Sequence, residues 1–266
     1  MNITCNDIAE FMEEIAPKCF AEEWDNVGQM AGSLNKPVYR VLLCLDVTPA
    51  IIDEAVEKKA NLIISHHPLI LQGIKRIVEE DYKGKILYKL IRNDIAVYSA
   101  HTNLDTADNG VNRKLAEKLG LNDIVNLKDT IAGMDGRKYG LGKVGLLKEP
   151  LTLKDFIYFV KTSLKVDNIK LVGNTDKMIK KVAVFCGSYD DDLDALKQHN
   201  ADILVTGDVK YHTAVDALNM GYCIIDAGHF NTENIVLPAL DKLISDRFPG
   251  IEVFCSQLEK DPFKTY

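Results

Sequence analysis

Short apolar runs alternate with amphipathic stretches along this chain, and this alternation restricts the fold more than any other feature of the sequence. The apolar runs share a β-branched content that is typical of buried strands. They lie at residues 41–45, 61–64, 95–100, 182–186, 202–205, 223–226 and 251–255. The amphipathic stretches predict helices at residues 49–59, 83–93, 110–119, 152–164, 190–199, 211–219 and 232–247. Because continuous apolar strands separated by helices are typical of a parallel sheet covered on both faces, the sequence predicts an α/β fold.

Two further segments complete the expected organisation. The opening predicts a helix that is capped by Asn6 or Asp7 and ends at Pro17. The middle of the chain, about residues 121–180, is less regular than the rest, apart from its one amphipathic helix.

The chain contains an internal repeat. Residues 41–66 align with residues 182–207 without a gap, and His101–Asp105 aligns with His229–Glu233. Both pentads have the pattern His-x-Asn-x-acid and follow an apolar strand. The general likeness of α/β units explains the aligned strands, but it does not explain two matching polar pentads.

The repeat predicts two structurally related α/β lobes. We expect a first lobe over residues 1–125 and a second over residues 126–233, with residues 234–266 packing back on the first. Repeats of this kind usually bring equivalent strand ends together across an interface, which suits a shared site in a cleft.

Composition excludes several classes of protein. The chain has 266 residues, is 47% hydrophobic and carries a net charge of −7, so it can bury a core and is poorly suited to non-specific nucleic-acid binding. It lacks an apolar stretch of membrane-spanning length and a signal-peptide pattern at its start, and its six cysteines form no CxxC pair. These features predict a cytoplasmic protein with free thiols and with no membrane or nucleic-acid partner.

The first polar motif combines two adjacent histidines with a proline. Ser65-His66-His67-Pro68 follows a predicted strand, at the end of the sheet where ligands bind in open α/β folds. Pro68 keeps the turn extended, so the two imidazoles point in different directions and suit two metal ions better than one. Taken alone, the pair is better explained as hydrogen-bonded loop histidines than as metal ligands.

Two further motifs each place a carboxylate four residues after a histidine. His101 precedes Asp105, and His229 precedes Glu233, in both cases after a predicted strand. Taken alone, each carboxylate also fits an ordinary turn or the first turn of a helix, where the helix dipole favours negative charge.

Together the motifs indicate a metal centre. The candidate ligands combine imidazoles and carboxylates at strand ends; they are His66, His67, Asp105, His229 and Glu233. A mixed set of this kind suits two divalent transition-metal ions (Fe, Zn, Mn, Co or Ni) better than Ca²⁺ or Mg²⁺ alone. Asp105 and Glu233 are candidate bridges between the ions, and His101 is either a further ligand or an acid/base group.

The motifs resemble those of one known family. The matching segments are Ser65–Pro68, Ala100–Asp105, Asp226–Glu233, Trp24–Gly28 and Thr206–His212. In sequence and order they are similar to the GTP cyclohydrolase I type 2 family, also called the NGG-interacting-factor-three-like family. The resemblance covers essentially the whole chain and corresponds to the short form, without the domain that many members insert between the lobes. It implies two α/β lobes, a dinuclear metal centre in the cleft between them, the five metal ligands given above and a toroidal homohexamer.

The resemblance and the ligand set predict a metal-dependent hydrolase. Its substrate would be a small purine nucleotide or phosphorylated compound, with ring opening of GTP as one candidate reaction. Two ions would lower the pKa of a bridging water, and His101 or His212 would transfer protons. Two alternatives fit the same ligands: a metal-binding or metal-delivery protein without its own turnover, and a regulatory ring protein in which the metal is structural.

Three other polar residues have two interpretations each. Asp46, after the first of the repeated strands, either supports a ligand histidine or is a plain turn residue. Asp208 and His212 either orient a substrate or water, or are a helix cap and a surface histidine. His199 is expected to be a favourable charge at a helix C-terminus.

Overall fold

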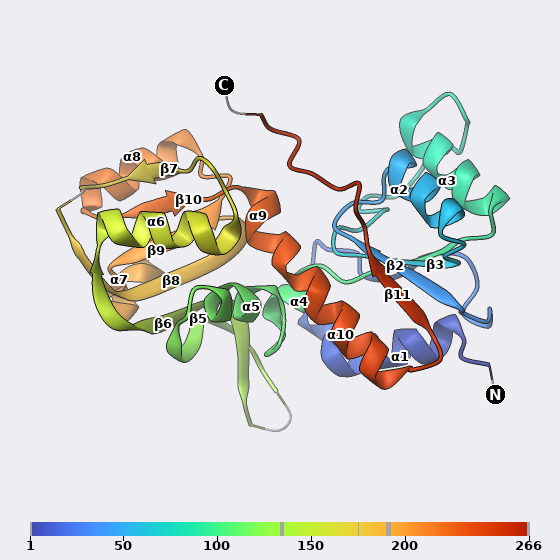
Figure 1. Ribbon diagram of the computed structural model, residues 1–266, viewed down its shortest axis with the longest axis horizontal. Helices are drawn as coiled ribbons and strands as arrows, with labels where there is room; N and C mark the ends of the chain where they lie inside the picture. The colour runs from blue at the N-terminus through green and yellow to red at the C-terminus, as the bar shows by residue number, and fades with distance from the viewer. Residues whose placement is uncertain (1, 134–135, 175, 190–192, 265–266) are drawn as a thin grey trace. The chain divides into compact units, whose positions relative to one another are not determined.

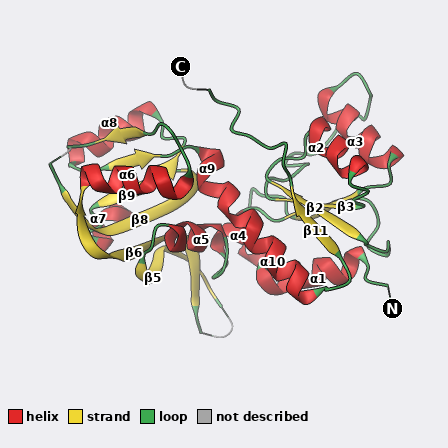
Figure 2. Ribbon diagram, viewed as in Figure 1, coloured by secondary structure: helices red, strands yellow, loops and turns green. Residues whose placement is uncertain are grey.

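The chain forms two compact units, each a sheet flanked by helices (Figure 1 and Figure 2). The computed structural model describes residues 2–133, 136–174, 176–189 and 193–264. Unit 1 comprises Met1–Leu104 and Leu237–Lys260, and unit 2 comprises Asp105–Val236 and Asp261–Tyr266.

The division between the units falls within the short helix α4 (Thr102–Thr106) and not near residue 125. The reason is that α5 (Val111–Lys118), which was assigned to the first lobe on sequence, packs on strands β6 (Lys138–Thr152) and β8 (Met178–Ser188) of unit 2. The segment Leu237–Lys260 returns to unit 1.

Unit 1 has a five-stranded sheet in the order β1-β4-β3-β2-β11. Its strands are β1 (Gly28–Ala31), β2 (Arg40–Cys44), β3 (Leu62–Ser65), β4 (Ala96–Ser99) and β11 (Glu252–Cys255). β4, β3, β2 and β11 run parallel, and β1 is antiparallel to β4. The residues of β2, β3 and β4 are almost all buried, which explains why these strands are continuous apolar runs in the sequence.

The helices of unit 1 are α1 (Cys5–Ile15), the 3₁₀ turn η1 (Lys18–Phe20), α2 (Pro49–Glu57), α3 (Tyr82–Arg92) and α10 (Leu237–Arg247). Two of them, α1 and α2, begin at a side chain that accepts a hydrogen bond from one of their first N–H groups. α1 is capped by Thr4, which forms a capping box with Asp7, so the cap lies before the two residues that the sequence suggested. Thr48 caps α2, and Pro49 occupies a first-turn position where a missing N–H costs nothing.

Unit 2 has a six-stranded mixed sheet in the order β5-β6-β8-β9-β10-β7. Its strands are β5 (Asn122–Ala132), β6 (Lys138–Thr152), β7 (Lys170–Val172), β8 (Met178–Ser188), β9 (Ile203–Gly207) and β10 (Ile224–Asp226). β8, β9 and β10 run parallel to one another, whereas β5 pairs antiparallel with β6, β6 with β8, and β7 with β10. In unit 2 the expected parallel pairing is therefore confined to these three strands.

The middle of the chain is more regular than its sequence suggests, because β5 and β6 are a long antiparallel pair. Most of β5 is exposed, so its side chains do not show the apolar pattern of a buried strand. Its conformation follows from pairing with β6, which is a tertiary interaction that local sequence does not reveal.

The helices of unit 2 are α5, α6 (Leu153–Leu164), α7 (Asp194–His199), α8 (Tyr211–Met220), α9 (His229–Glu233) and the 3₁₀ turn η2 (Asn234–Val236). Residues 190–192 of the helix predicted at 190–199 lie outside the described residues. The helix predicted at 232–247 is instead three pieces, α9, η2 and α10. Pro238, near the start of α10, explains the break because it has no N–H to continue a preceding helix.

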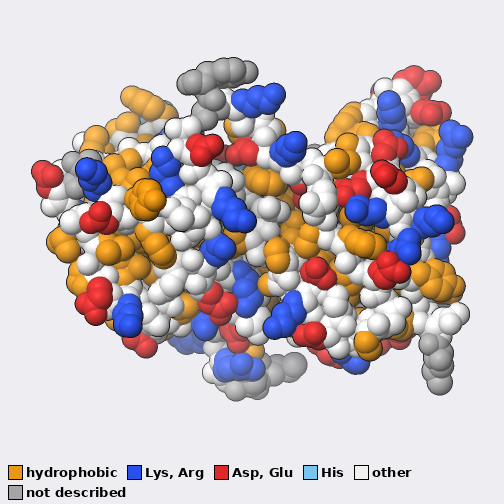
Figure 3. Space-filling model, viewed as in Figure 1, with side chains coloured by type: hydrophobic (Ala, Val, Ile, Leu, Met, Phe, Trp, Pro, Cys, Tyr) orange, Lys and Arg blue, Asp and Glu red, His pale blue; other side chains and the backbone are white. Residues whose placement is uncertain are grey.

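Two surface properties of the described residues complete the fold. None of the described helices combines the length and apolar character needed to span a bilayer. Figure 3 shows apolar side chains gathered over α6 and α8 of unit 2, where Tyr158, Tyr211 and Leu218 are exposed.

Candidate metal centre

The loop after β3 presents His66 and His67 on a tightly held turn. The N–H of His66 donates to the carbonyl of Cys44 at 3.0 Å, and the N–H of His67 donates to the carbonyl of Leu45 at 2.9 Å. The Ser65 hydroxyl donates to the carbonyl of His67 at 2.9 Å. The backbone at the carboxyl end of β3 is therefore tied to the neighbouring strand β2, and the two imidazoles have fixed starting points.

Three histidines of unit 1 form one cluster. Candidate ligand atoms of His66, His67 and His101 all lie within 4.8 Å of one another. Their ring centroids are separated by 5.1 Å (His66 to His67), 5.1 Å (His66 to His101) and 5.5 Å (His67 to His101). The cluster arises because β3 and β4 are adjacent and parallel, so that the residues after them meet at the same edge of the sheet.

The rings of His66 and His67 are oriented through Nδ1. His66 Nδ1 lies 2.9 Å from the carbonyl oxygen of Ala100, and His67 Nδ1 lies 3.1 Å from Asp46 Oδ1. A neutral imidazole that donates from Nδ1 carries its lone pair on Nε2, which is the arrangement found in most metal-binding histidines. Asp46 therefore contacts a candidate ligand histidine. This agrees with the interpretation that Asp46 supports a ligand, and not with its being a plain turn residue.

His101 is oriented in the same way by a carboxylate that the sequence did not single out. His101 Nδ1 lies 3.0 Å from Oδ1 of Asp25, whose side chain is fully buried. The Thr102 N–H and hydroxyl donate to Asp25 Oδ2 at 3.0 and 2.6 Å. Burial alone would raise the pKa of Asp25, but the hydrogen bonds from His101 and Thr102 outweigh it and hold that pKa at about 2. Asp25 is therefore an ionised partner of His101.

The loop that carries Asp46 is held by a residue from late in the chain. The carboxylate of Glu259 accepts the N–H of Leu45 at 2.8 Å and the N–H of Asp46 at 2.6 Å. Burial raises the pKa of Glu259, although the two backbone hydrogen bonds act against it. Glu259 thus fixes the turn after β2.

Unit 2 presents a histidine and a carboxylate in direct contact. His229 Nε2 lies 3.1 Å from Glu233 Oε2, and His229 Nδ1 lies 2.8 Å from Asp208 Oδ2. Asp208 follows β9 and His229 follows β10, so the pair again depends on adjacent parallel strands. Asp208 does not cap α8, whose N-cap residue is Lys210.

Close packing at the ends of β8 and β10 fixes Glu233 in unit 2. Gly187, near the end of β8, has φ of +66°, and a Cβ built there would lie 2.3 Å from Glu233 Oε1. Its N–H donates to the Thr232 hydroxyl at 3.0 Å. Gly228, which precedes α9, has φ of +91° and allows the sharp exit from β10. Glu233 is the last residue of α9, not a first-turn residue as expected for a simple helix cap.

Asp105 is buried in unit 2 beside a cysteine. The thiol of Cys186 donates to Asp105 Oδ1 at 3.1 Å, and the amide of Asn112 donates to the Asp105 carbonyl at 3.1 Å. Burial raises the pKa of the Cys186 thiol, and the carboxylates of Asp105 and Glu233 raise it further. The neutral thiol is therefore a hydrogen-bond donor to a candidate ligand.

The donor sets fit a transition metal. Unit 1 supplies three imidazoles and unit 2 supplies an imidazole and two buried carboxylates, Asp105 and Glu233. Mixed imidazole and carboxylate ligands are typical of Zn, Fe, Mn, Co and Ni sites. The four histidines of these sets share a further property, since the Nδ1 of each lies against an oxygen acceptor.

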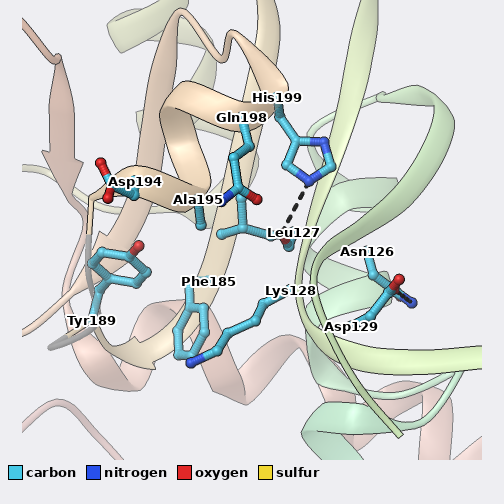
Figure 4. A pocket seen from close by; sticks show the side chains of 10 residues that line it. All are labelled: Asn126, Leu127, Lys128, Asp129, Phe185, Tyr189, Asp194, Ala195, Gln198 and His199. Atoms are coloured by element: carbon cyan, nitrogen blue, oxygen red, sulfur yellow. Dashed lines mark hydrogen bonds between the residues drawn. The ribbon is translucent and has the colours of Figure 1, made fainter. Parts of the chain in front are cut away.

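Two histidines that were considered on sequence, His212 and His199, lie outside these donor sets. His212 is exposed near the start of α8, with its ring 5.3 Å from that of Tyr211. His199 ends α7, and its Nε2 lies 3.0 Å from the carbonyl oxygen of Leu127. Figure 4 shows His199 at a cavity of about 570 Å³ in unit 2, which none of the predicted ligands lines.

Sequence reasoning missed Asp25 and Glu259. Asp25 is 76 residues from His101, and Glu259 is more than two hundred residues from the loop that it holds. The only signal for Asp25 in the sequence is its position in Trp24–Gly28, one of the segments that carry the family resemblance. Nothing in the local sequence of Glu259 distinguishes it from other surface carboxylates.

Comparison with known proteins places this geometry in context. The model of the Duf34/NIF3 (NGG1p interacting factor 3) family matches residues 3–262. A protein from Clostridium perfringens named GTP cyclohydrolase 1 type 2 homolog is 38% identical over 97% of this chain and 98% of its own length. A Bacillus subtilis protein of the same name is 30% identical over 98% of both chains, in an alignment that spans 367 positions, so it contains residues that this chain lacks. The crystal structure of a Bacillus cereus protein related to NIF3 has a TM-score of 0.94 and 30% identity, covering 100% of this chain and 99% of that one.

Proposed function

The chain belongs to the Duf34/NIF3 family, and on that basis we propose that it is a metal-dependent hydrolase of a small purine nucleotide or phosphorylated substrate. One observation carries the proposal. His66, His67 and His229, the three histidines proposed as ligands, all have Nδ1 against a carboxylate or carbonyl oxygen. Histidines of a solvated loop do not need this shared arrangement, whereas metal ligands do, because it fixes the tautomer and raises the basicity of the ligand nitrogen.

We further propose that the donors of both units serve one dinuclear centre. Its ligands would be His66, His67, Asp105, His229 and Glu233, as expected from the sequence. The chain itself supports this grouping, because His101 of the unit 1 cluster and Asp105 of unit 2 are only four residues apart. The internal repeat supports it too, since β2, β3 and β4 and then β8, β9 and β10 are each three adjacent parallel strands whose ends carry the donors.

Metal bound to these residues would lower the pKa of a water molecule and polarise the bond under attack. The residues around the donors have separate roles. Asp25 holds His101 so that its Nε2 would take up or release a proton near the substrate. Asp46 and Asp208 keep His67 and His229 in single orientations, which removes the cost of ordering them during the reaction. His212 stays a predicted second proton carrier.

We also propose an oligomeric state and a cellular location for the protein. A homohexamer is expected from the family resemblance, and the exposed apolar side chains over α6 and α8 offer area for subunit contacts. A reducing cytoplasmic location is supported by six cysteines that are all free thiols.

Metal content and turnover of the same preparation test the function. The protein is purified, stripped with a chelator and reloaded separately with Fe²⁺, Zn²⁺, Mn²⁺, Co²⁺ or Ni²⁺. Bound metal is counted, and hydrolysis is assayed on a panel of nucleotides and phosphoesters. We expect two ions per chain and turnover with at least one metal. His67→Ala should lose both, while His199→Ala, which alters a histidine outside the donor sets, should keep both.

The alternatives give different results in the same experiment. Stoichiometric metal without turnover on any substrate would favour a metal-delivery protein. Loss of the oligomer and of thermal stability in His67→Ala, with no reaction in the parent protein, would favour a regulatory ring with structural metal. Absence of bound metal under every loading condition would contradict all three.

A further inference from the structure

The single tryptophan of the chain stands exposed beside the histidine cluster of unit 1. Trp24 is 59% exposed, and its ring lies edge-on to His101 with the centroids 5.8 Å apart. His101 in turn contacts the rings of His66 and His67. Trp24 therefore ends a continuous row of aromatic rings that begins at the candidate metal ligands.

The backbone that carries Trp24 is held firmly even though the side chain is exposed. Directly after it, Asp25 accepts two hydrogen bonds from Thr102, and its N–H donates to the carbonyl of Glu22 at 3.0 Å. The Glu22 N–H donates to the Thr102 hydroxyl at 2.9 Å. This set of hydrogen bonds clamps the tryptophan loop to the turn that carries His101, so Trp24 has a fixed position relative to the cluster.

The exposed indole of Trp24 is suited to contact a ligand of the neighbouring site. An exposed apolar side chain on a mobile loop needs no explanation. A large rigid ring that is kept out of the core and fixed next to candidate metal ligands presents a flat apolar face to a ligand of that site. The neighbouring Glu22 and Glu23 make this stretch acidic, so the chain here suits an uncharged ring and not a phosphate group.

We propose that Trp24 is the stacking platform for the planar heteroaromatic base of the substrate, a purine in the first instance. The inference rests on the proposed function, which it makes more specific by assigning recognition of the base to one side chain of unit 1. The phosphate groups of a nucleotide would then be left to the metal ions and not to the tryptophan loop. Base stacking on an aromatic side chain tolerates any base, so the platform would supply affinity for the ring, and other contacts would choose among bases.

Because Trp24 is the only tryptophan, its fluorescence reports on this position alone. Chelator-stripped protein is titrated with guanosine, adenosine and GTP, and in parallel with ribose 5-phosphate and inorganic triphosphate. We expect saturable quenching by the three compounds that contain a base and none by the two that lack one. Calorimetry then compares guanosine affinity in the parent protein, Trp24→Ala, Trp24→Phe and Tyr82→Ala, the last at an equally exposed aromatic residue of α3 in unit 1.

Trp24→Ala should weaken guanosine binding roughly 5- to 150-fold, the range that corresponds to loss of one base–aromatic stack. Trp24→Phe should keep most of the affinity, and Tyr82→Ala should keep all of it. Metal stoichiometry should be unchanged in every variant, because Trp24 supplies no ligand atom. Equal guanosine affinity in Trp24→Ala and the parent protein, or equal quenching by inorganic triphosphate and GTP, would overturn the proposal. Failure of the proposed function would be seen separately, as missing metal or missing turnover.

Discussion

The histidines of the candidate centre depend on oxygens that are not themselves ligands. Asp46 is largely exposed, yet it orients His67 through a 3.1 Å contact at Nδ1. Such supporting groups fix the orientation of a ligand histidine and raise the basicity of its metal-binding nitrogen, so their removal weakens metal binding. The exposed position of Asp46 makes it a clean place to test this, because its removal should not disturb the core.

Asp46→Ala should therefore lower metal affinity about 10- to 100-fold with little change in stability. Metal binding is measured by calorimetry and the free energy of unfolding by urea titration. Asp53→Ala is the control, since Asp53 is similarly exposed in unit 1 but pairs with Lys89 on the helices. Equal metal affinity in the two variants would contradict the role given to Asp46.

Gly187 provides a second test at the scale of one atom. Its φ of +66° disfavours a side chain, and an added Cβ would lie 2.3 Å from Glu233 Oε1. Gly187→Ala should cost about 1 kcal/mol or more of stability and should also displace Glu233, which would reduce metal affinity. Gly221→Ala separates the two effects, because Gly221 has φ of +78° but an added Cβ would meet nothing within 4 Å. If both variants bind metal as tightly as the parent protein, Glu233 is not a ligand.

At the scale of elements, strand β6 contains a buried lysine, Lys143, that makes the stability of the fold depend on pH. Lys143 is 3% exposed, and its Nζ donates to Asn126 Oδ1 at 2.6 Å and to the Gly140 carbonyl at 3.0 Å. Burial lowers the pKa of Lys143 to about 8, with Asp108 acting in the opposite direction. The unfolded chain therefore binds more protons than the folded chain between pH 8 and the ordinary lysine value, and this group makes stability rise with pH across that window.

The increase in unfolding free energy that Lys143 causes should reach about 3 kcal/mol between about pH 8 and 10.5. The difference in unfolding free energy between the parent protein and Lys143→Met should change by that amount over this range. Lys154→Met, at an exposed position of α6, should show a difference that does not vary with pH. A constant difference for both variants would mean that Lys143 is charged throughout in the folded state.

The elements also show how far the sequence alone could go. Buried parallel strands such as β2, β3 and β9 were predicted nearly to the residue, because burial on both faces makes them continuous apolar runs. β5 could not be predicted in this way, since it is mostly exposed and takes its conformation from β6. The separation of α9 from α10 was missed although Pro238 was visible in the sequence.

The same limit applies to the candidate site. The motif histidines could be identified because they follow strands directly, and topology brings neighbouring strand ends together. Their supporting carboxylates could be anticipated only where they too follow a strand, as Asp46 does. Asp25 contacts His101 through a loop whose path depends on the folded unit, so no local pattern could have assigned it.

At the scale of the whole molecule, metal should act as a folding ligand. A ligand that binds only the folded chain adds about 2.7 kcal/mol at a hundred times its Kd, which corresponds to a rise in Tm of roughly 5–10 °C for a chain of this size. We expect this rise when metal is restored to stripped protein, and its reversal by chelator. Calorimetry with His67→Ala is the control, since that variant should not respond. An unchanged Tm with all five metals would contradict a shared centre.

Chain order has a consequence for when the protein can become active. β11 pairs with β2, and Glu259 holds the loop of Asp46, yet both follow the long segment Asp105–Val236 of unit 2 along the polypeptide. During synthesis on the ribosome, unit 1 thus stays incomplete until translation has passed Asp105–Val236 of unit 2 and reached Leu237–Lys260. A nascent chain that has not yet reached β11 and Glu259 would lack the contacts that hold Asp46 beside His67, so we expect the proposed metal centre to assemble only after these late residues have been synthesised.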